Sequence, residues 1–166
     1  IFPSTSAAAF NSFFIIDIKP QNSFLENIVV NFNTTALSGL AGGTPYMLPA
    51  AFWIQRIELV INDKVIDTIL GEIIWTQHQL FSVNDEERKA NNVEMGDYSS
   101  VSTLNTLSTT AGSDWYVELF SLFKQSHIPV GVFPNHTIQL RIYMKSVSDL
   151  CVLNGATGTP SMSITS

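Results

Sequence analysis

Charged residues are scarce in this sequence. They make up 13% of its 166 residues, about half of the ~25% that is usual in globular proteins, whereas hydrophobic residues make up 45%. The eight Lys and Arg residues form no cluster larger than Arg88-Lys89, which argues against nucleic-acid binding through a basic patch. A chain with so little charge to coat an isolated surface is typical of a protein that is buried in an assembly.

Cysteine and long hydrophobic runs are scarce as well. Cys151 is the only cysteine, so the chain has no internal disulfide and no cysteine-based metal site, and we expect a small buried thiol. No apolar run approaches the ~18 residues that span a bilayer, and the first residues lack the charged start of a secretory signal. The length suits one domain with its own core. We therefore expect an N-terminal arm at residues 1–11 and a single domain at residues 12–166.

No arrangement of residues in the sequence indicates catalysis. Histidine occurs only at His78, His127 and His136, without the i, i+3 or i, i+4 spacing of metal ligands, so packing is the preferred interpretation. The motifs of nucleophilic hydrolases and of nucleotide-binding loops are missing. We interpret the acidic run at residues 85–87 as a capped, solvated helix start rather than an acid–base pair or a calcium loop. The sequence thus assigns no catalytic residue, metal ligand, cofactor-binding residue or cofactor, and predicts that the protein is not an enzyme.

The tryptophans and two short motifs raise the question of sugars. Trp53, Trp75 and Trp115 would suit a sugar-stacking platform, but each lies at the boundary of a predicted element. A core or interface anchor is expected there, so we favour packing. Residues 33–35 (Asn-Thr-Thr) and 135–137 (Asn-His-Thr) match the glycosylation sequon, a short pattern that carries little weight without a secretory signal.

The stretch from Trp115 to Lys145 predicts two long strands joined by an apolar connection. In its second half, apolar and polar residues alternate with the period of two that a half-buried strand requires, the apolar ones being Ile138, Leu140, Ile142 and Met144. The first half, residues 115–124, is apolar on both faces. We expect both faces of this strand to be buried, with the additional cover supplied by a second sheet or by a neighbouring subunit. The connection at residues 127–134 is expected to pack down as a short turn or helix.

Further strands precede this stretch. β-Branched and aromatic residues predict strands at 12–18 and 26–32, with Asn22 and Ser23 in the turn between them. Residues 33–49 lack periodicity and predict a long loop.

A hairpin is predicted from residues 52–61 and 65–70. We expect a three-residue loop at 62–64, which sets Ile61 opposite Val65 and Ile57 opposite Ile69. A two-residue loop would place Glu58 opposite Asp67, and directly opposed like charges are unfavourable.

The period changes to that of a helix after this hairpin. Residues 71–81 carry apolar side chains at helical spacing, and Asn84 is the expected N-cap of a second helix, with Glu87 as its reciprocal partner. Together they predict a short helical insert at residues 71–92. The segment 95–114, rich in Ser and Thr, is interpreted as a loop or a weak edge strand.

The C-terminal part predicts a strand at 147–153, a turn at Asn154-Gly155, a break at 158–160 and the start of one more strand at 162–165. Short alternating strands separated by turn residues favour an all-β antiparallel sandwich. With seven or eight strands and one helical insert, the predicted fold is an eight-stranded jelly roll, which consists of two Greek keys.

The order of these features resembles a known family. The sequences VIDTIL, GEIIWTQHQL, EERK and WYVELFSLFKQSHIPVGVFPNHTIQLRIYM follow one another between Phe52 and Lys145. This order is similar to the first jelly roll of the major capsid proteins of double-jelly-roll viruses, which include large DNA viruses, virophages and polinton-like viruses. Two features depart from the family pattern: the chain has room for one jelly roll only, and its aromatic strand, with Phe120 and Phe123, is less aromatic. We expect the N-terminal half of a longer capsid protein, the alternative being a single-jelly-roll relative.

The resemblance implies a structural viral capsid protein. Such a protein associates with itself into homotrimers, the pseudo-hexagonal capsomers that tile an icosahedral shell, and contacts neighbouring capsomers and penton or minor capsid proteins. It is located in the virion, is assembled inside the host cell, and binds no specific nucleic acid and inserts into no membrane. The segments expected to make contacts are the N-terminal arm and residues 34–49 and 99–112, because they are long and weakly charged.

Two other functions stay open at this point. A carbohydrate-binding, lectin-like β-sandwich module would show an exposed, coplanar aromatic pair. An enzyme of the cupin kind on the same scaffold would need clustered histidines and carboxylates inside the barrel, and the sequence offers no such set.

Overall fold

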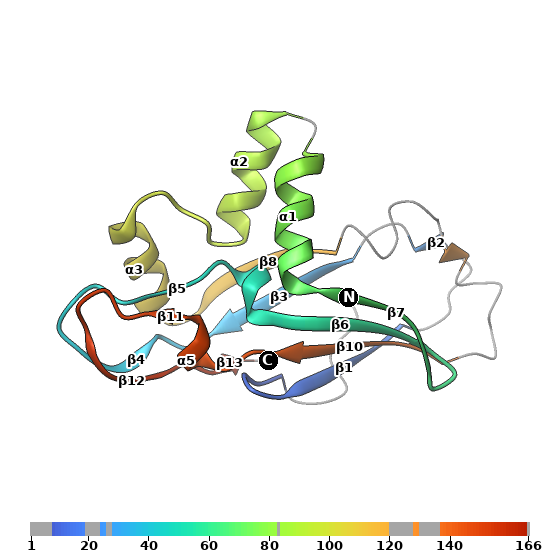
Figure 1. Ribbon diagram of the computed structural model, residues 1–166, viewed down its shortest axis with the longest axis horizontal. Helices are drawn as coiled ribbons and strands as arrows, with labels where there is room; N and C mark the ends of the chain where they lie inside the picture. The colour runs from blue at the N-terminus through green and yellow to red at the C-terminus, as the bar shows by residue number, and fades with distance from the viewer. Residues whose placement is uncertain are drawn as a thin grey trace.

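Four antiparallel strands form the larger of two facing sheets (Figure 1). The structure is a computed structural model. It describes residues 8–18, 24–25, 28–82, 84–119, 128–129 and 137–165. The strand order is β1 (Phe13–Ile18), β10 (Ile138–Met144), β6 (Ile54–Ile61) and β7 (Lys64–Leu70). In β10 every second residue is buried, as the alternating sequence predicts. The predicted strands at 12–18, 52–61, 65–70 and 137–145 are thus confirmed within one or two residues.

The second sheet has β3 (Val29–Thr34) at its centre, between β8 (Ser113–Glu118) and the two-residue strand β13 (Ile164–Thr165). The two strands predicted between Trp115 and Lys145 therefore lie in different sheets. β8 is buried on one face only, since Tyr116 points outward and is exposed. The prediction that both faces of this strand are buried is therefore wrong for β8. Residues 120–124 of that predicted strand lie outside the described part of the chain.

Three further pairs of short strands extend the sandwich. They are β2 (Phe24–Leu25) with β9 (Ile128–Pro129), β4 (Ser38–Ala41) with β12 (Thr157–Ser161), and β5 (Tyr46–Met47) with β11 (Cys151–Val152). The prediction of a long loop at 33–49 was therefore wrong, because β4 and β5 pair with strands near the C-terminal end of the described chain. Of the predicted 127–134 connection, only β9 is described, and the predicted turn at Asn22 and Ser23 lies outside the described residues.

The predicted strand at 147–153 is also corrected. It begins with a short helix, α5 (Val147–Leu150), because Ser146 accepts a hydrogen bond from the Asp149 amide and so caps a helical turn. The turn at Asn154-Gly155 is confirmed, since both residues have positive φ. The predicted break at 158–160 appears as a register shift within β12.

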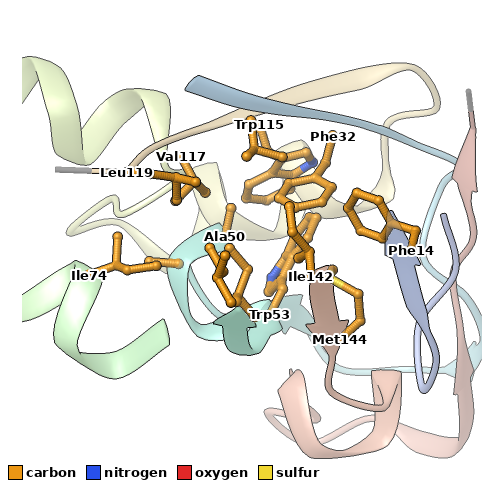
Figure 2. Close-up of a cluster of buried hydrophobic side chains, with 14 of the residues drawn as sticks. Phe14, Phe32, Ala50, Trp53, Ile74, Trp115, Val117, Leu119, Ile142 and Met144 are labelled. Atoms are coloured by element: carbon orange, nitrogen blue, oxygen red, sulfur yellow. The ribbon is translucent and has the colours of Figure 1, made fainter. Parts of the chain in front are cut away.

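Aromatic side chains fill the space between the two sheets (Figure 2). Trp53, at the end of the 3₁₀ helix η1 (Ala50–Trp53), contacts Trp115 of β8 with ring centroids 4.6 Å apart. The ring centroid of Phe32 in β3 lies 5.9 Å from that of Trp53 and 6.2 Å from that of Phe14 in β1. Both tryptophan rings are fully buried, so this aromatic cluster joins strands from both sheets and is the centre of the core.

Three helices follow β7. α1 (Gly71–Phe81) and α2 (Asp85–Glu94) stand side by side and project from the sheets (Figure 1), and both were predicted. Asn84 accepts a hydrogen bond from the Glu87 amide at 2.8 Å, which confirms the N-cap. The interpretation of residues 95–114 as a loop or edge strand was wrong, because α3 (Val101–Thr109) occupies this segment. The helical part is therefore longer than the predicted insert at 71–92.

The β6–β7 hairpin turn differs from the prediction. It has two residues, Asn62 and Asp63, both with positive φ, and it sets Ile61 opposite Lys64. A bulge then shifts the register between Val60 and Leu59, so that Thr68 faces Glu58 and Ile69 faces Ile57. The bulge, rather than a longer loop, removes the unfavourable pair of carboxylates.

Candidate interaction surface

The outward face of the larger sheet carries a row of apolar and aromatic side chains across all four strands. The register places Phe13 opposite Tyr143, Tyr143 opposite Arg56, and Arg56 opposite Leu70. The rings of Phe13 and Tyr143 stack with centroids 5.3 Å apart, and the Arg56 guanidinium carbon lies 3.6 Å from the centre of the Tyr143 ring. The row is therefore held in place by stacking and by a cation–π contact.

Glu58 compensates the positive charge of Arg56 on this face. Its carboxylate accepts a hydrogen bond from Arg56 Nε at 2.8 Å and another from the Tyr143 hydroxyl at 3.1 Å. The Arg56 hydrogen bond is the main reason that the pKa of Glu58 lies below its ordinary value, and the Tyr143 hydrogen bond adds to it, whereas burial opposes the shift. With its cation and its carboxylate paired, this part of the face presents mainly apolar and aromatic groups.

The lowered pKa of Glu58 predicts a pH effect. A carboxylate whose pKa is depressed by folding contributes stability above its ordinary pKa and loses that contribution as the pH falls through its folded value. We therefore expect Glu58→Gln to destabilise the protein near neutral pH and to make its stability fall less steeply with acidification than that of the wild type. Urea unfolding between about pH 6 and pH 3 measures this difference, and parallel curves for the two proteins would contradict it.

Exposed apolar side chains also line β7 and the first turn of α1. We call Val65, Ile66, Leu70 and Ile73 the β7 strip; their exposed fractions are 51%, 59%, 48% and 44%. β7 is the outer strand of its sheet, but its edge is blunted. The register is bulged, and the Asp67 carboxylate accepts a hydrogen bond from the Thr68 amide at 2.8 Å, so this strip is suited to side-chain contacts rather than to strand addition.

The segments that the sequence indicated as contact sites are partly built into the fold. Phe10, near the end of the predicted N-terminal arm, packs edge-on against Trp53 at 5.4 Å. Residues 8–11 line an open groove of about 310 Å³ together with Val147 and residues 160–164. A hydrogen bond joins the other two segments, residues 34–49 and 99–112. The hydroxyl of Ser108 in α3 is buried and accepts it from the Met47 amide at 2.9 Å.

The candidate residues for chemistry have structural partners. His78 is buried on α1, and its Nε2 lies 2.9 Å from the Glu118 carbonyl oxygen, which can only accept, so Nε2 carries the proton. The acidic residues 85–87 form the first turn of α2. Within the described residues, no group of three His, Cys, Asp or Glu side chains is arranged to hold a metal ion. His127 and His136 lie outside that part of the chain.

Cys151 is half-buried rather than fully buried as expected, and burial raises the pKa of its thiol. The two sequons also differ in what the structure shows. The side-chain amide of Asn33 donates a hydrogen bond from Nδ2 to the Gly112 carbonyl oxygen at 3.3 Å and another to Asp114 Oδ1 at 3.1 Å. This asparagine is therefore hydrogen-bonded within the fold. The sequon at 135–137 has its asparagine outside the described residues.

The tryptophans do not form a sugar platform. Trp53 and Trp115 are fully buried, and Trp75 packs against Phe52 with ring centroids 5.5 Å apart. On the outward face, Tyr143 lies between Phe13 and Arg56, so its ring faces are covered on both sides. Packing, the interpretation favoured from the sequence, describes all three tryptophans.

The row on the outward face was not identified from the sequence. Its members, Phe13, Tyr143, Arg56 and Leu70, are outward-pointing residues of the predicted strands. The alternation of each strand gives their orientation, but which residues become neighbours depends on the register between strands, and the sequence pattern does not specify it.

The family profile for the N-terminus of major capsid proteins matches residues 3–166. The chain belongs to this family. It is a structural component of a viral capsid, and its place is in the virion. Among the described residues, no helix is long and apolar enough to cross a membrane.

Solved capsid structures share the fold of this capsid domain. The crystal structure of PBCV-1 VP54 fitted into a cryo-EM reconstruction of the virophage Sputnik matches with a TM-score of 0.65 and 21% identity, over 98% of this chain and 39% of that chain. The quasi-atomic model of the PBCV-1 virus capsid matches with a TM-score of 0.64 and 22% identity, over the same two shares. No curated protein sequence matches. The antiparallel jelly-roll class is confirmed, whereas the count of eight strands is not: the described residues contain thirteen strands, five of which have only two residues.

Proposed function

We propose that this capsid domain is the first of two jelly rolls in a longer protein, three copies of which form a pseudo-hexagonal capsomer. Capsomers of this kind would tile an icosahedral shell, with penton and minor capsid proteins as further partners. The length of the solved relatives supports the first part, since the chain spans only 39% of each. The β7 strip supports self-association, because large exposed apolar side chains in a sparsely charged domain mark a contact surface.

A charge placed in the β7 strip tests this proposal. Ile66 is the most exposed residue of the strip, so Ile66→Lys should leave the fold intact while placing an unpaired ammonium in the contact between subunits. We expect the complete protein to form trimers and the variant to associate at least about tenfold more weakly. Light scattering over a range of protein concentrations measures the oligomeric state of the wild-type protein and the strength of association of the variant.

Thr157→Lys is the matched control, because Thr157 is also exposed in a strand but lies in β12, which pairs with β4 and is not part of the β7 strip, and this variant should still form trimers. A wild-type protein that remains a monodisperse monomer at high concentration would contradict the trimer. Unchanged trimerisation of Ile66→Lys would show that the β7 strip is not the contact surface.

A further inference from the structure

Two short connections lie against each other at one end of the sandwich (Figure 1). One joins β4 to β5 through residues 42–45, and the other joins β11 to β12 through residues 153–156. Because β4 pairs with β12 and β5 pairs with β11, both connections are held at the same end of these four strands. The second one carries Asn154 and Gly155, the only Asn-Gly pair in the sequence.

An Asn-Gly pair is chemically reactive. The backbone nitrogen of Gly155 can lose its proton to a base and attack Cγ of the Asn154 side chain. A C–N bond then forms, the bond from Cγ to Nδ2 breaks, and the side-chain nitrogen takes up a proton and leaves as ammonia. Water opens the resulting cyclic imide at either carbonyl carbon and leaves aspartate or isoaspartate. Glycine favours the attack because it has no Cβ to shield its nitrogen.

Thr44 holds both the side chain and the backbone of Asn154. The Asn154 side-chain amide donates from Nδ2 to Thr44 Oγ1, and also to the Thr44 carbonyl oxygen at 3.4 Å. The Thr44 amide in turn donates to the Asn154 carbonyl oxygen at 3.2 Å. The first two hydrogen bonds fix the direction of the side chain that must turn toward Gly155. The third fixes the peptide group that contains the attacking nitrogen.

The backbone around this peptide group is closely packed as well. The Ala156 amide donates to the Leu153 carbonyl oxygen at 2.9 Å and closes the turn. Gly43 lies directly against it, since a Cβ there would come within 2.5 Å of the Gly155 carbonyl carbon and 2.7 Å of the Asn154 carbonyl oxygen. Packing of this kind leaves the peptide group little room for the rotation that the attack requires.

We propose that Asn154 is a site of spontaneous deamidation and that Thr44 slows the reaction in the folded domain. The reaction consumes water and releases ammonia, and it needs neither an enzyme nor a cofactor. Its products do not fit the site, because a carboxylate has no hydrogen to donate and would face the Thr44 carbonyl oxygen. Isoaspartate also adds a methylene group to the main chain of a short turn. Modification therefore loosens the end of the domain where β4 and β5 meet β11 and β12, and the domain ages at this end.

Peptide mapping by mass spectrometry measures the reaction after the complete protein has been kept in warm, mildly alkaline buffer. Thr44→Val removes the hydroxyl acceptor at an exposed position and keeps the shape of the side chain. We expect Asn154 to deamidate at least about fivefold faster in this variant than in the wild type, the effect of losing one net hydrogen bond. Thr44→Ser is the matched control, because it keeps the hydroxyl and should react at about the wild-type rate.

Asn62 provides a reference site within the same samples. It also has a positive φ in a turn, but it is followed by Asp63 and lies between β6 and β7. Its rate of deamidation should be the same in the wild type and in Thr44→Val. Equal acceleration at Asn62 and Asn154 would show that the variant loosens the whole domain, which would overturn the local role of Thr44.

The unfolded wild-type protein gives a comparison that needs no variant. In urea, Asn154 should be the asparagine that deamidates fastest, and folding should slow it by more than the factor lost in Thr44→Val. Equal rates at Asn154 in the folded and the unfolded protein would overturn the inference. Equal rates in the wild type and Thr44→Val would overturn it too.

Asn154→Asp reproduces one product of the reaction. We expect this variant to unfold at a lower urea concentration than the wild type, because its carboxylate lies next to the Thr44 carbonyl oxygen. An unchanged unfolding midpoint would contradict the loosening of this end of the domain.

Discussion

Replacement of Trp115 by alanine is expected to lower the free energy of unfolding by about 3–5 kcal/mol, the usual cost of deleting a large aromatic side chain from a core. The Trp115 ring is fully buried and packs on Trp53. Its Nε1 donates a hydrogen bond to the Thr34 hydroxyl at 3.2 Å, so the variant loses a polar contact as well as packing. Urea unfolding followed by circular dichroism measures the change, independently of tryptophan emission.

Tyr116→Ala is the matched control for this experiment. Tyr116 is the next residue of β8 and points to the other face, where its side chain is exposed. We expect this variant to lose about 1 kcal/mol or less, since little area is removed from the core. Equal losses for Trp115→Ala and Tyr116→Ala would contradict the arrangement of β8 with one buried face.

The second large effect is expected from Gly96→Ala. Gly96 follows α2 with a φ of +77°, and a Cβ at this position would overlap the six-membered ring of Trp115. The alanine variant therefore suffers both backbone strain and displacement of the central aromatic ring. We expect a loss of about 3 kcal/mol or more in the free energy of unfolding, because overpacking alone costs about 1–3 kcal/mol.

Gly112→Ala separates these two causes. Gly112 has a similar φ of +76°, but a Cβ there would meet no atom within 4 Å. Its alanine variant carries only the strain of the left-handed backbone, about 1–2 kcal/mol. Thermal or urea unfolding of both variants gives the difference, which reports the contact with Trp115. A Gly112→Ala variant as unstable as Gly96→Ala would show that backbone strain explains both.

Strongly periodic segments were predictable from the sequence. The alternation in β10, the apolar runs of β1 and β6, and the capped start of α2 each appear where the pattern placed them. In these segments local propensity and the pattern of burial agree, so that one interpretation of the residues is clearly preferred.

The errors fall where contacts distant in the sequence decide the structure. α3 has few apolar residues, and its position depends on Ser108, whose hydroxyl and carbonyl oxygen accept hydrogen bonds from the Met47 and Leu37 amides. β4 and β5 have little strand propensity of their own and are strands because β12 and β11 pair with them. Neither partnership leaves a local pattern in the sequence.

The hairpin turn shows a different limit. Avoiding the Glu58–Asp67 pair was the correct physical argument, but two backbone solutions satisfy it, and the chain adopts a two-residue turn with a bulge. The sequence Asn62-Asp63 tolerates the positive φ that such a turn requires. The resemblance to the capsid family was carried by the order of elements between residues 52 and 145, which survives such local differences and is confirmed over residues 3–166.

The register of the larger sheet also bears on how the protein is made. Its outer strand β1 pairs only with β10 among the described strands, Phe13 lying opposite Tyr143. During translation β1 is synthesised before β10. At ~5–20 residues per second, β10 is completed about seven to twenty-five seconds after β1. Until then the backbone groups of β1 have no partner strand in this sheet. The nascent chain is thus exposed to aggregation in this interval, and a holding chaperone would have most effect then.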